Sequence, residues 1–366
     1  MSSGSFYKNL IDESLICGRC GNCRNDCPVY KEIGWESAAP RAKISLAREI
    51  FARNSEVNIS LLWKDLRAKL VADGKAPAAY TAMVDNLKDK KNISNFANGT
   101  RLDWAEELDE IPENLDQEPG AEVVYFVGCV SSFFPRAAQV PVAMVQLLQK
   151  AGVNYTTMGS EEWCCGFPLL AAGHAAEILE FARHNVDTVR KMGAKTLVTG
   201  CASCYHVWSH VYPEVLGESL GFRLVHATEM LAELVSTGKL VPNELNQTVT
   251  YHDPCDLGRN SGIINPPRQI INSIPGIKFT EMATSGEEAT CCGGGGNLQG
   301  ADAGLADAIA GKRIKEAAET GATIVVSACQ QCEQMLEKAA RTEKLPLQVM
   351  DVSELLLMSI DNCNDD

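Results

Sequence analysis

The chain contains 366 residues, of which 45% are hydrophobic and 22% are charged, and its formal net charge is -14. This composition is typical of a globular protein of two or three small domains. The acidic balance argues against nucleic acid and anionic membrane surfaces as partners, so a membrane would be reached only through another subunit. No signal-like or membrane-length apolar segment is present, which predicts a cytoplasmic location. There the fifteen cysteines would stay reduced and serve metal ligation or redox chemistry.

Residues 1–57 contain a cysteine run with the spacing C-x2-C-x2-C-x3-C-P, formed by Cys17, Cys20, Cys23 and Cys27. This spacing matches the bacterial ferredoxin run and predicts one cubane 4Fe-4S cluster, while a zinc site or solvent-facing thiols fit it less well. In two-cluster ferredoxins the fourth cysteine of such a run serves the other cluster, and no second run exists here. The fourth ligand is therefore Cys27, which we favour, or Cys363, which is more simply explained as an exposed thiol near the end of the chain.

Residues 58–120 are predicted to be helical and then irregular, ending in the acidic, proline-containing linker EELDEIPENLDQEPG. A linker of this composition is typical of a domain boundary. We expect two further lobes after it, over 121–245 and 246–366, because the cysteine pattern of the first is repeated in the second.

Each repeat contains a lone cysteine, then a Cys-Cys-Gly, then a Cys-x-x-Cys, and corresponding cysteines of the two copies lie 126 to 128 residues apart. Such constant spacing indicates a duplicated structural unit. The first copy has Cys129, Cys164, Cys165, Cys201 and Cys204, and the second has Cys255, Cys291, Cys292, Cys329 and Cys332.

Strands and helices are predicted to alternate within each repeat. An apolar strand ends at the lone cysteine (123–129 and 249–255), an amphipathic helix and a short strand follow, then a longer helix (174–192 and 301–320), and a buried strand runs into the Cys-x-x-Cys. Alternation of this kind predicts an α/β fold with mainly parallel sheets. Since ligands of such folds gather beyond the carboxyl ends of the strands, the five thiols of a repeat are expected to converge there.

Zinc and iron both remain possible for these ten cysteines. A Cys-x-x-Cys is a familiar half of a structural zinc site, but a four-coordinate zinc would leave one thiolate of each set unused. An iron cluster can use adjacent thiolates on neighbouring irons. Glycines after each pair, Gly166 and then Gly293 to Gly296, would let the backbone approach a cluster or a substrate, although a flexible loop is the simpler explanation of such a run.

Four other polar residues near the cysteines have weaker claims. His252 and Asp253 precede Cys255 and would either supply a proton to a departing thiolate or hydrogen-bond a strand end, and we favour the structural role. His206 and His210 would share a helix face, but with no carboxylate partner nearby in sequence a second metal site is not expected there.

Two such repeats behind a ferredoxin-type segment resemble the CCG-domain (cysteine-rich) iron–sulfur oxidoreductases related to the catalytic subunits of heterodisulfide reductase, and the iron–sulfur subunits of glycolate and lactate oxidases are similar. The resemblance covers nearly the whole chain and implies one noncubane 4Fe-4S cluster held by the five cysteines of each repeat. Two departures are visible. The segment 58–75 lacks the second ferredoxin run of fused members, and Asp256 stands where many relatives carry histidine.

We therefore expect an oxidoreductase subunit that reduces a small-molecule disulfide. No G-x-G-x-x-G fingerprint marks a flavin or nicotinamide site, so electrons would come from a flavoprotein or ferredoxin-like partner. The alternative is an electron relay between a flavin dehydrogenase, acting on a 2-hydroxy acid or an acyl-CoA, and a quinone or membrane partner. A third, non-enzymatic interpretation is a zinc-stabilised scaffold protein, which would be colourless rather than brown.

Overall fold

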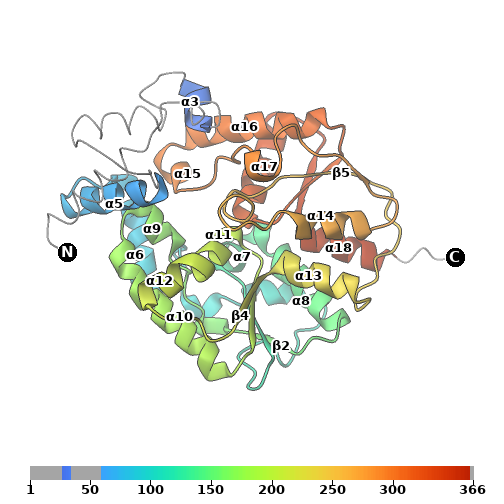
Figure 1. Cartoon of the computed structure of the whole chain (residues 1–366), viewed down its shortest axis with the longest axis horizontal. Coiled ribbons are helices and arrows are strands. Elements are labelled where there is room, and N and C mark those ends of the chain that lie inside the picture. Colours follow the sequence, from blue (N-terminus) through green and yellow to red (C-terminus); the bar gives the residue numbers. More distant parts are fainter. Residues whose placement is uncertain (1–26, 34–58, 363–366) are drawn as a thin grey trace.

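A computed structural model of the chain describes residues 27–33 and 59–362 (Figure 1). Cys17, Cys20, Cys23 and Cys363 lie outside the described residues, so the expected ferredoxin-type segment is represented only by Cys27 and the helix that follows it.

Two four-stranded parallel sheets form the framework, with strand orders β2-β1-β3-β4 and β6-β5-β7-β8. The α/β class predicted from the repeats is confirmed. The central strands are short runs rich in valine and other β-branched residues, and they are buried on both faces, as parallel sheets covered by helices require. The strands are β1 (Val123–Phe126), β2 (Tyr155–Thr157), β3 (Thr196–Thr199), β4 (Arg223–His226), β5 (Thr248–Tyr251), β6 (Lys278–Phe279), β7 (Ile324–Ser327) and β8 (Gln348–Asp351).

Helices connect the strands and cover both sheets (Figure 1). Ahead of the sheets lie α3 (Pro28–Ile33), α5 (Ile59–Ala72) and α6 (Thr81–Lys90). The first lobe contains α7 (Cys129–Phe133), α8 (Gln139–Lys150), α9 (Phe167–Ala172), α10 (Ile178–Met192), α11 (Ala202–His206), a π-helical turn at Val207–Val211, α12 (Tyr212–Leu216) and α13 (Ala227–Ser236). The second contains α14 (Asn265–Ser273), α15 (Leu298–Ala301), α16 (Ala303–Glu319), α17 (Gln330–Thr342) and α18 (Val352–Asp361), and single 3-10 turns follow Pro77, Ala97, Leu102, Phe134, Met158, His174 and Ser285.

The long helices begin later than the sequence pattern predicted. A 3-10 turn precedes α10, which starts at Ile178. In the second lobe the predicted helix is interrupted at Asp302, whose side chain accepts a hydrogen bond from the backbone N–H of Leu305 at 2.9 Å. An aspartate that caps a helix in this way fixes its first turn, so α15 and α16 are separate helices.

The two lobes pack through equivalent helices. In repeat order α14 is the counterpart of α8, and α18 is the counterpart of α13. Across the boundary α8 packs on α18, and α14 packs on α13 (Figure 1). Replacing each helix of the first contact by its counterpart gives the second contact, so the two lobes are related by a pseudo-two-fold axis. One continuous apolar core includes Leu147 and Leu231 of the first lobe together with Ile271 and Leu355 of the second. The relative position of the two sheets is therefore fixed by burial of shared apolar surface.

The helices ahead of the sheets contact both lobes. Helix α3 lies on α16, where Lys312 forms an ion pair with Glu32 at 2.7 Å, and α5 packs against α9. Within the described ranges, 27–33 and 59–362, we find no helix with both the length and the apolar character needed to cross a membrane.

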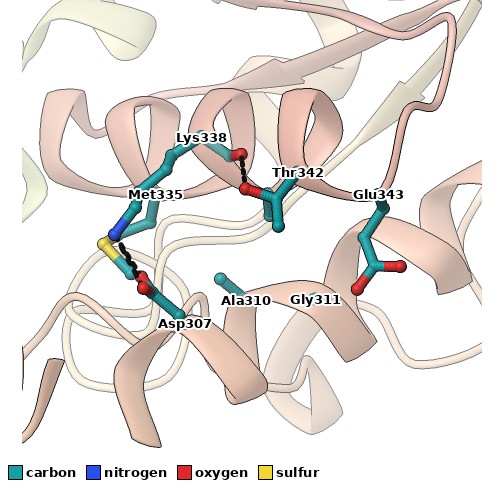
Figure 2. Close-up of a pocket in the computed structure, with 8 residues that line it drawn as sticks. Asp307, Ala310, Gly311, Met335, Lys338, Thr342 and Glu343 are labelled. Atoms are coloured by element: carbon teal, nitrogen blue, oxygen red, sulfur yellow. Dashed lines mark hydrogen bonds and ion pairs between the residues drawn. The ribbon is translucent and has the colours of Figure 1, made fainter. Parts of the chain in front are cut away.

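A small gap between α16 and α17 is a packing feature (Figure 2). Its volume is about 20 Å³, which is close to the space one water molecule needs. Lys338 of α17 reaches across it to Asp307 of α16 at 2.7 Å, and Gly311 allows the approach of Glu343. The gap is too small for a substrate.

Candidate metal centres

The structure places the cysteines of both repeats at the carboxyl ends of the strands, as expected. In the first lobe Cys129 begins α7 just after β1, and Cys201 immediately precedes α11 just after β3. The Cys-Cys-Gly lies in the loop between β2 and α9, where Gly166 adopts a φ of 87° that favours glycine. Three segments far apart in sequence therefore meet at one edge of the sheet.

All five thiols of the first lobe are connected. Cys129 contacts Cys164, which contacts Cys165; Cys165 contacts Cys204, and Cys204 contacts Cys201. Four of the five are buried and Cys201 is partly exposed. The convergence predicted from the spacing is what the structure shows for this set.

The second lobe repeats the arrangement. Cys255 contacts Cys291, Cys291 contacts Cys292, Cys292 contacts Cys332, and Cys332 contacts Cys329. Cys255 and Cys291 are partly exposed and the other three are buried. Each lobe thus presents one compact group of five sulfurs built from the same three loops.

One thiol in each adjacent pair is made more acidic by its neighbours. Hydrogen bonds from Cys164 and Cys204 lower the pKa of Cys165 to about 6. Hydrogen bonds from Cys255 and Cys292 lower the pKa of Cys291 well below its usual range. The pKa of the other thiol in each pair, Cys164 or Cys292, is raised well above its usual range, so hydrogen bonding favours the thiolate, which is the form that binds metal, at one sulfur of each pair.

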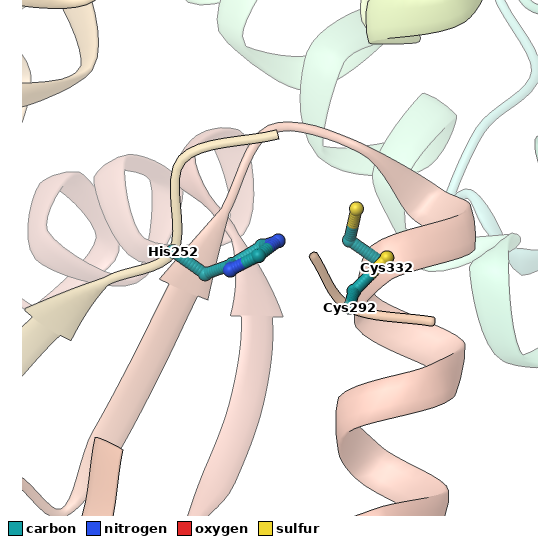
Figure 3. Close-up of side chains that lie close together, drawn as sticks. All are labelled: His252, Cys292 and Cys332. Carbon is teal, nitrogen blue, oxygen red and sulfur yellow. The ribbon is translucent and has the colours of Figure 1, made fainter. Parts of the chain in front are cut away.

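His252 lies beside the second group of thiols. One of its ring nitrogens lies within 4.8 Å of the sulfurs of Cys292 and Cys332 (Figure 3). Nδ1 accepts a hydrogen bond from Nε of Arg313 at 3.0 Å, so the ring proton must sit on Nε2. Burial and the Arg313 charge lower the pKa of His252 to about 3. The ring is thus a neutral hydrogen-bond donor, and its side chain is held by Arg313 rather than by the strand end expected from the sequence.

Asp253 serves the loop rather than the thiols. Its two carboxylate oxygens accept hydrogen bonds from Arg268 at 2.8 and 2.9 Å, and Oδ2 also accepts one from the backbone N–H of Gly286 at 2.8 Å. The carboxylate is 2% exposed and fully engaged. These contacts are those of a strand-end anchor, again the structural alternative.

A buried ion pair supports the first group of thiols, and no motif in the sequence pointed to it. Arg101 and Glu162 are each 1% exposed and approach to 2.7 Å. Glu162 also accepts hydrogen bonds from the backbone N–H groups of Val127 and Gly128, both at 2.8 Å, and Arg101 lies 3.5 Å from the sulfur of Cys129. The pair therefore fixes the loop that carries Cys129 and places a cation beside its sulfur.

Two positions near the Cys-x-x-Cys motifs differ between the lobes: the residue after the motif and the last residue of the final strand, β4 or β8. In the second lobe burial, together with the neighbouring Asp351, raises the pKa of Glu333 well above its usual range. The equivalent positions of the first lobe hold Tyr205 and His226, whose rings lie 5.9 Å apart. The two thiol groups are alike in sulfur but unlike in surroundings.

His206 and His210 stack on one another, with ring centroids 4.8 Å apart. In the part of the chain that the structure describes, they do not join a third residue in a metal-binding group.

Two hydrogen bonds join the lobes near the thiols. Asp256 accepts a hydrogen bond from Ser203 at 2.6 Å, which joins the loop of the second lobe's lone cysteine to the first lobe's Cys-x-x-Cys. A second contact across the boundary runs from Gln330 to the backbone oxygen of Gly200, at 3.1 Å.

A cavity of about 360 Å³ opens between the lobes at the first group of thiols. All five of its cysteines line the cavity, and the opposite wall is formed by the second lobe's glycine run and the start of α17. Tyr80 and Met83, from the helices ahead of the sheets, and Ile93, from the irregular segment after α6, border it as well.

The donor sets fit iron–sulfur clusters better than zinc. Each group contains five sulfurs, one more than a tetrahedral zinc uses, and adjacent cysteines supply two of them. The nearby cations and glycine backbone are typical surroundings of an anionic cluster.

Comparison with known proteins supports this chemistry. A family model described as a cysteine-rich domain, CCG, matches residues 123–208 and 249–337, the two repeats. The chain is 34% identical to one subunit of the dihydromethanophenazine:CoB–CoM heterodisulfide reductase of Methanosarcina mazei, over 95% of each chain. It is 29% identical to the EtfAB:quinone oxidoreductase of Syntrophomonas wolfei, over 97% of this chain and 48% of that protein.

Among solved structures, a hypothetical protein from Helicobacter pylori matches with a TM-score of 0.54 and 10% identity. The match covers 100% of this chain and 74% of the other, and at this identity it supports the fold alone.

Proposed function

The chain belongs to the CCG-domain iron–sulfur oxidoreductases, whose members include a heterodisulfide reductase component, and from this premise we propose that it reduces a small-molecule disulfide. The observation that carries the proposal is the presence of two complete groups of five thiols in lobes whose relative position is fixed. Cleavage of a disulfide needs two electrons, and two equivalent redox centres can supply them.

The cysteines have the following roles in this proposal. Bound iron–sulfur clusters supply one-electron redox chemistry. One noncubane 4Fe-4S cluster would be held by Cys129, Cys164, Cys165, Cys201 and Cys204, a second by Cys255, Cys291, Cys292, Cys329 and Cys332, and one cubane 4Fe-4S cluster by Cys17, Cys20, Cys23 and Cys27.

Neighbouring residues hold these groups in place. Arg101 offsets negative charge at Cys129, and the His252 ring, which Arg313 holds in place, lies beside the sulfurs of Cys292 and Cys332. Cys27 is held beside the second lobe, because α3 follows it and lies on α16.

The electron donor in this proposal is a flavoprotein or ferredoxin-like subunit. The relatives include a subunit of a heterodisulfide reductase and an EtfAB:quinone oxidoreductase, which supports a partner subunit in general. We place the protein in the cytoplasm, with contact to a membrane only through such a partner. The four parts of the chain, 1–57, 58–120, 121–245 and 246–366, would act as cluster segment, helical cover and two cluster lobes.

The test is a stoichiometric reaction of the anaerobically purified, reduced chain. We expect a low-molecular-weight disulfide to be consumed with release of two thiols for every two electrons lost. Cys329→Ser should abolish turnover while the cubane cluster still accepts electrons from an artificial donor. Ala328→Ser, which adds a hydroxyl at the buried neighbouring position, is the matched control and should retain turnover.

The second candidate is an electron relay, favoured by the similarity to a quinone oxidoreductase. A relay needs only single-electron transfers and no substrate site at the thiols. If the protein reduces quinone analogues or partner flavoproteins freely and ignores every disulfide, the relay function replaces the reductase function.

A further inference from the structure

His252 connects Arg313 to the second group of thiols. It follows β5 and points toward Cys292 and Cys332 (Figure 3), with one ring nitrogen within 4.8 Å of both sulfurs. Its Nδ1 accepts the hydrogen bond from Nε of Arg313 at 3.0 Å. Because an arginine side chain is always charged and can only donate, this contact fixes the tautomer of the ring and leaves Nε2–H as the donor that the ring still offers.

Arg313 carries a positive charge into the interior of the second lobe. Its side chain is fully buried, whereas the side chain of Glu316, its ion-pair partner at 2.7 Å, is 17% exposed. Nη1 also donates to the backbone oxygen of Thr284 at 3.0 Å, and Nη2 has no hydrogen-bond partner among the described residues. The cation is the deeper member of its pair, so its charge is only partly offset where it meets His252.

The first lobe differs at both positions. Phe126, like His252, lies three residues before the lone cysteine of its repeat, and it packs edge-to-face on Trp208 with ring centroids 5.4 Å apart. Asn185 is the counterpart of Arg313, since each lies eight residues before the positive-φ glycine that follows its helix. The Asn185 amide is buried and donates to the backbone of the Cys-Cys-Gly loop at 3.3 Å. An apolar ring and a neutral amide therefore stand where the second lobe has a hydrogen-bond donor and a cation.

The buried cation of the first lobe is balanced by an equally buried anion. Arg101 lies 3.5 Å from the sulfur of Cys129, but Glu162 approaches it to 2.7 Å, and both side chains are 1% exposed. Two opposite charges at the same depth largely cancel at a distance. The pair therefore adds little net charge near the first group of thiols, in contrast to Arg313 in the second lobe.

We propose that Arg313 and His252 form a positioning pair that raises the reduction potential of the cluster held by the second group of thiols. The inference rests on that cluster, which the proposed function assigns. Hydrogen bonds to cluster sulfur and a nearby positive charge favour the reduced form, because reduction adds negative charge. Arg313 acts through His252, since it holds the ring in the orientation and tautomer that present Nε2–H to sulfur. The electron comes from the protein's donor, and neither residue gains or loses a proton.

The experiment is a potentiometric titration of the full chain with its clusters, followed by electron paramagnetic resonance. The signal of the second group is the one that is lost in Cys292→Ser. In His252→Phe, which introduces the residue type of the first lobe, the ratio of reduced to oxidised cluster at a fixed potential should fall at least about tenfold, a shift of about 59 mV for one electron. Arg313→Asn should lower the potential as well. The double variant should shift it no further than the larger single shift, because the two residues act as one unit.

Two control variants separate this effect from a general loss of charge or structure. Lys315→Asn removes a cation from the same helix, at a side chain that is 55% exposed and paired with Glu343, and should leave the potential unchanged. His252→Gln keeps an N–H donor at about the reach of Nε2 and should retain most of the wild-type potential. Each variant is compared at the iron content of the wild type.

A second readout needs no substitution that could prevent folding. In the wild type labelled with 15N-histidine, pulsed electron paramagnetic resonance should show a histidine nitrogen coupled to the signal of the second group. The inference is overturned if this coupling is absent, or if His252→Phe keeps its iron and the wild-type potential. Single shifts that add in the double variant would also overturn it, because the two residues would then act separately. If the potential shifts as expected but no disulfide is consumed, the proposed function fails while this inference stands.

Discussion

The ion pair between Arg101 and Glu162 offers a direct test of how the first group of thiols is held. In Arg101→Met the cation is lost, while Glu162 remains 1% exposed and still accepts hydrogen bonds from the backbone of Val127 and Gly128. Removal of one partner from a fully buried pair costs about 3–5 kcal/mol, because an uncompensated charge is left in the interior. We expect the free energy of unfolding to fall by that amount.

The assay is urea unfolding under anaerobic conditions, followed by circular dichroism, with hydrogen exchange at 127–129 as a local measurement. Lys338→Met is the matched control, because Lys338 and Asp307 form an ion pair at 2.7 Å that is 46% and 42% exposed. Such a surface pair contributes about 0–1 kcal/mol. The double variant Arg101→Met with Glu162→Gln should recover part of the loss, since the buried charge is removed as well.

The reasoning is refuted if Arg101→Met loses no more stability than Lys338→Met. Equal protection of the 127–129 backbone in wild type and variant would lead to the same conclusion. Retention of stability with loss of one iron–sulfur signal would instead assign Arg101 to the metal centre alone.

Three further predictions concern the metal content, one carboxyl group and the glycine run. Iron analysis of the purified protein should give about twelve iron atoms per chain. The variant Cys292→Ser should contain about eight, and its spectrum should keep the ferredoxin-type signal. Zinc in place of iron would contradict this prediction. Burial raises the pKa of Glu354 from 4.5 to about 7. The protonated carboxyl therefore contributes up to about 3 kcal/mol to the free energy of unfolding at low pH, and this contribution is lost as the pH rises through about 7. In Glu354→Gln the free energy of unfolding should depend less on pH. Gly293→Ala should lose at least about 2 kcal/mol in urea unfolding, because its φ is 84° and a Cβ would lie 2.3 Å from the backbone oxygen of Ala306. The control Gly295→Ala has open space and should change stability by less than about 0.5 kcal/mol; similar losses in both would contradict the argument.

The elements that repeat were predictable from the sequence. Apolar strands followed by cysteines at constant spacing are local patterns, and the carboxyl ends of parallel strands must share one edge, so convergence of the thiols followed. The edge strands β4 and β8 were not predicted, because they begin with the exposed residues Arg223 and Gln348 and lack a continuous apolar run.

Contacts between distant segments were beyond the sequence pattern. Arg101 and Glu162 are 61 residues apart, and their meeting depends on how the segment before β1 folds over the first lobe. The role of His252 was left open between proton supply and support, since only the position of Arg313 decides which ring nitrogen carries the proton.

The crossed pairing of α8 with α18 and of α13 with α14 is the pattern expected of a symmetric dimer of single repeats. In such a dimer every substitution appears at both centres at once, so the two must remain identical. Fusion into one chain removes that restriction, and its result is visible where Tyr205 and His226 of one half correspond to Glu333 and Asp351 of the other. Inherited symmetry keeps the geometry of the two thiol groups alike. We expect the divergence of their surroundings to give the two proposed clusters unequal affinities for electrons, and hence electron flow a direction.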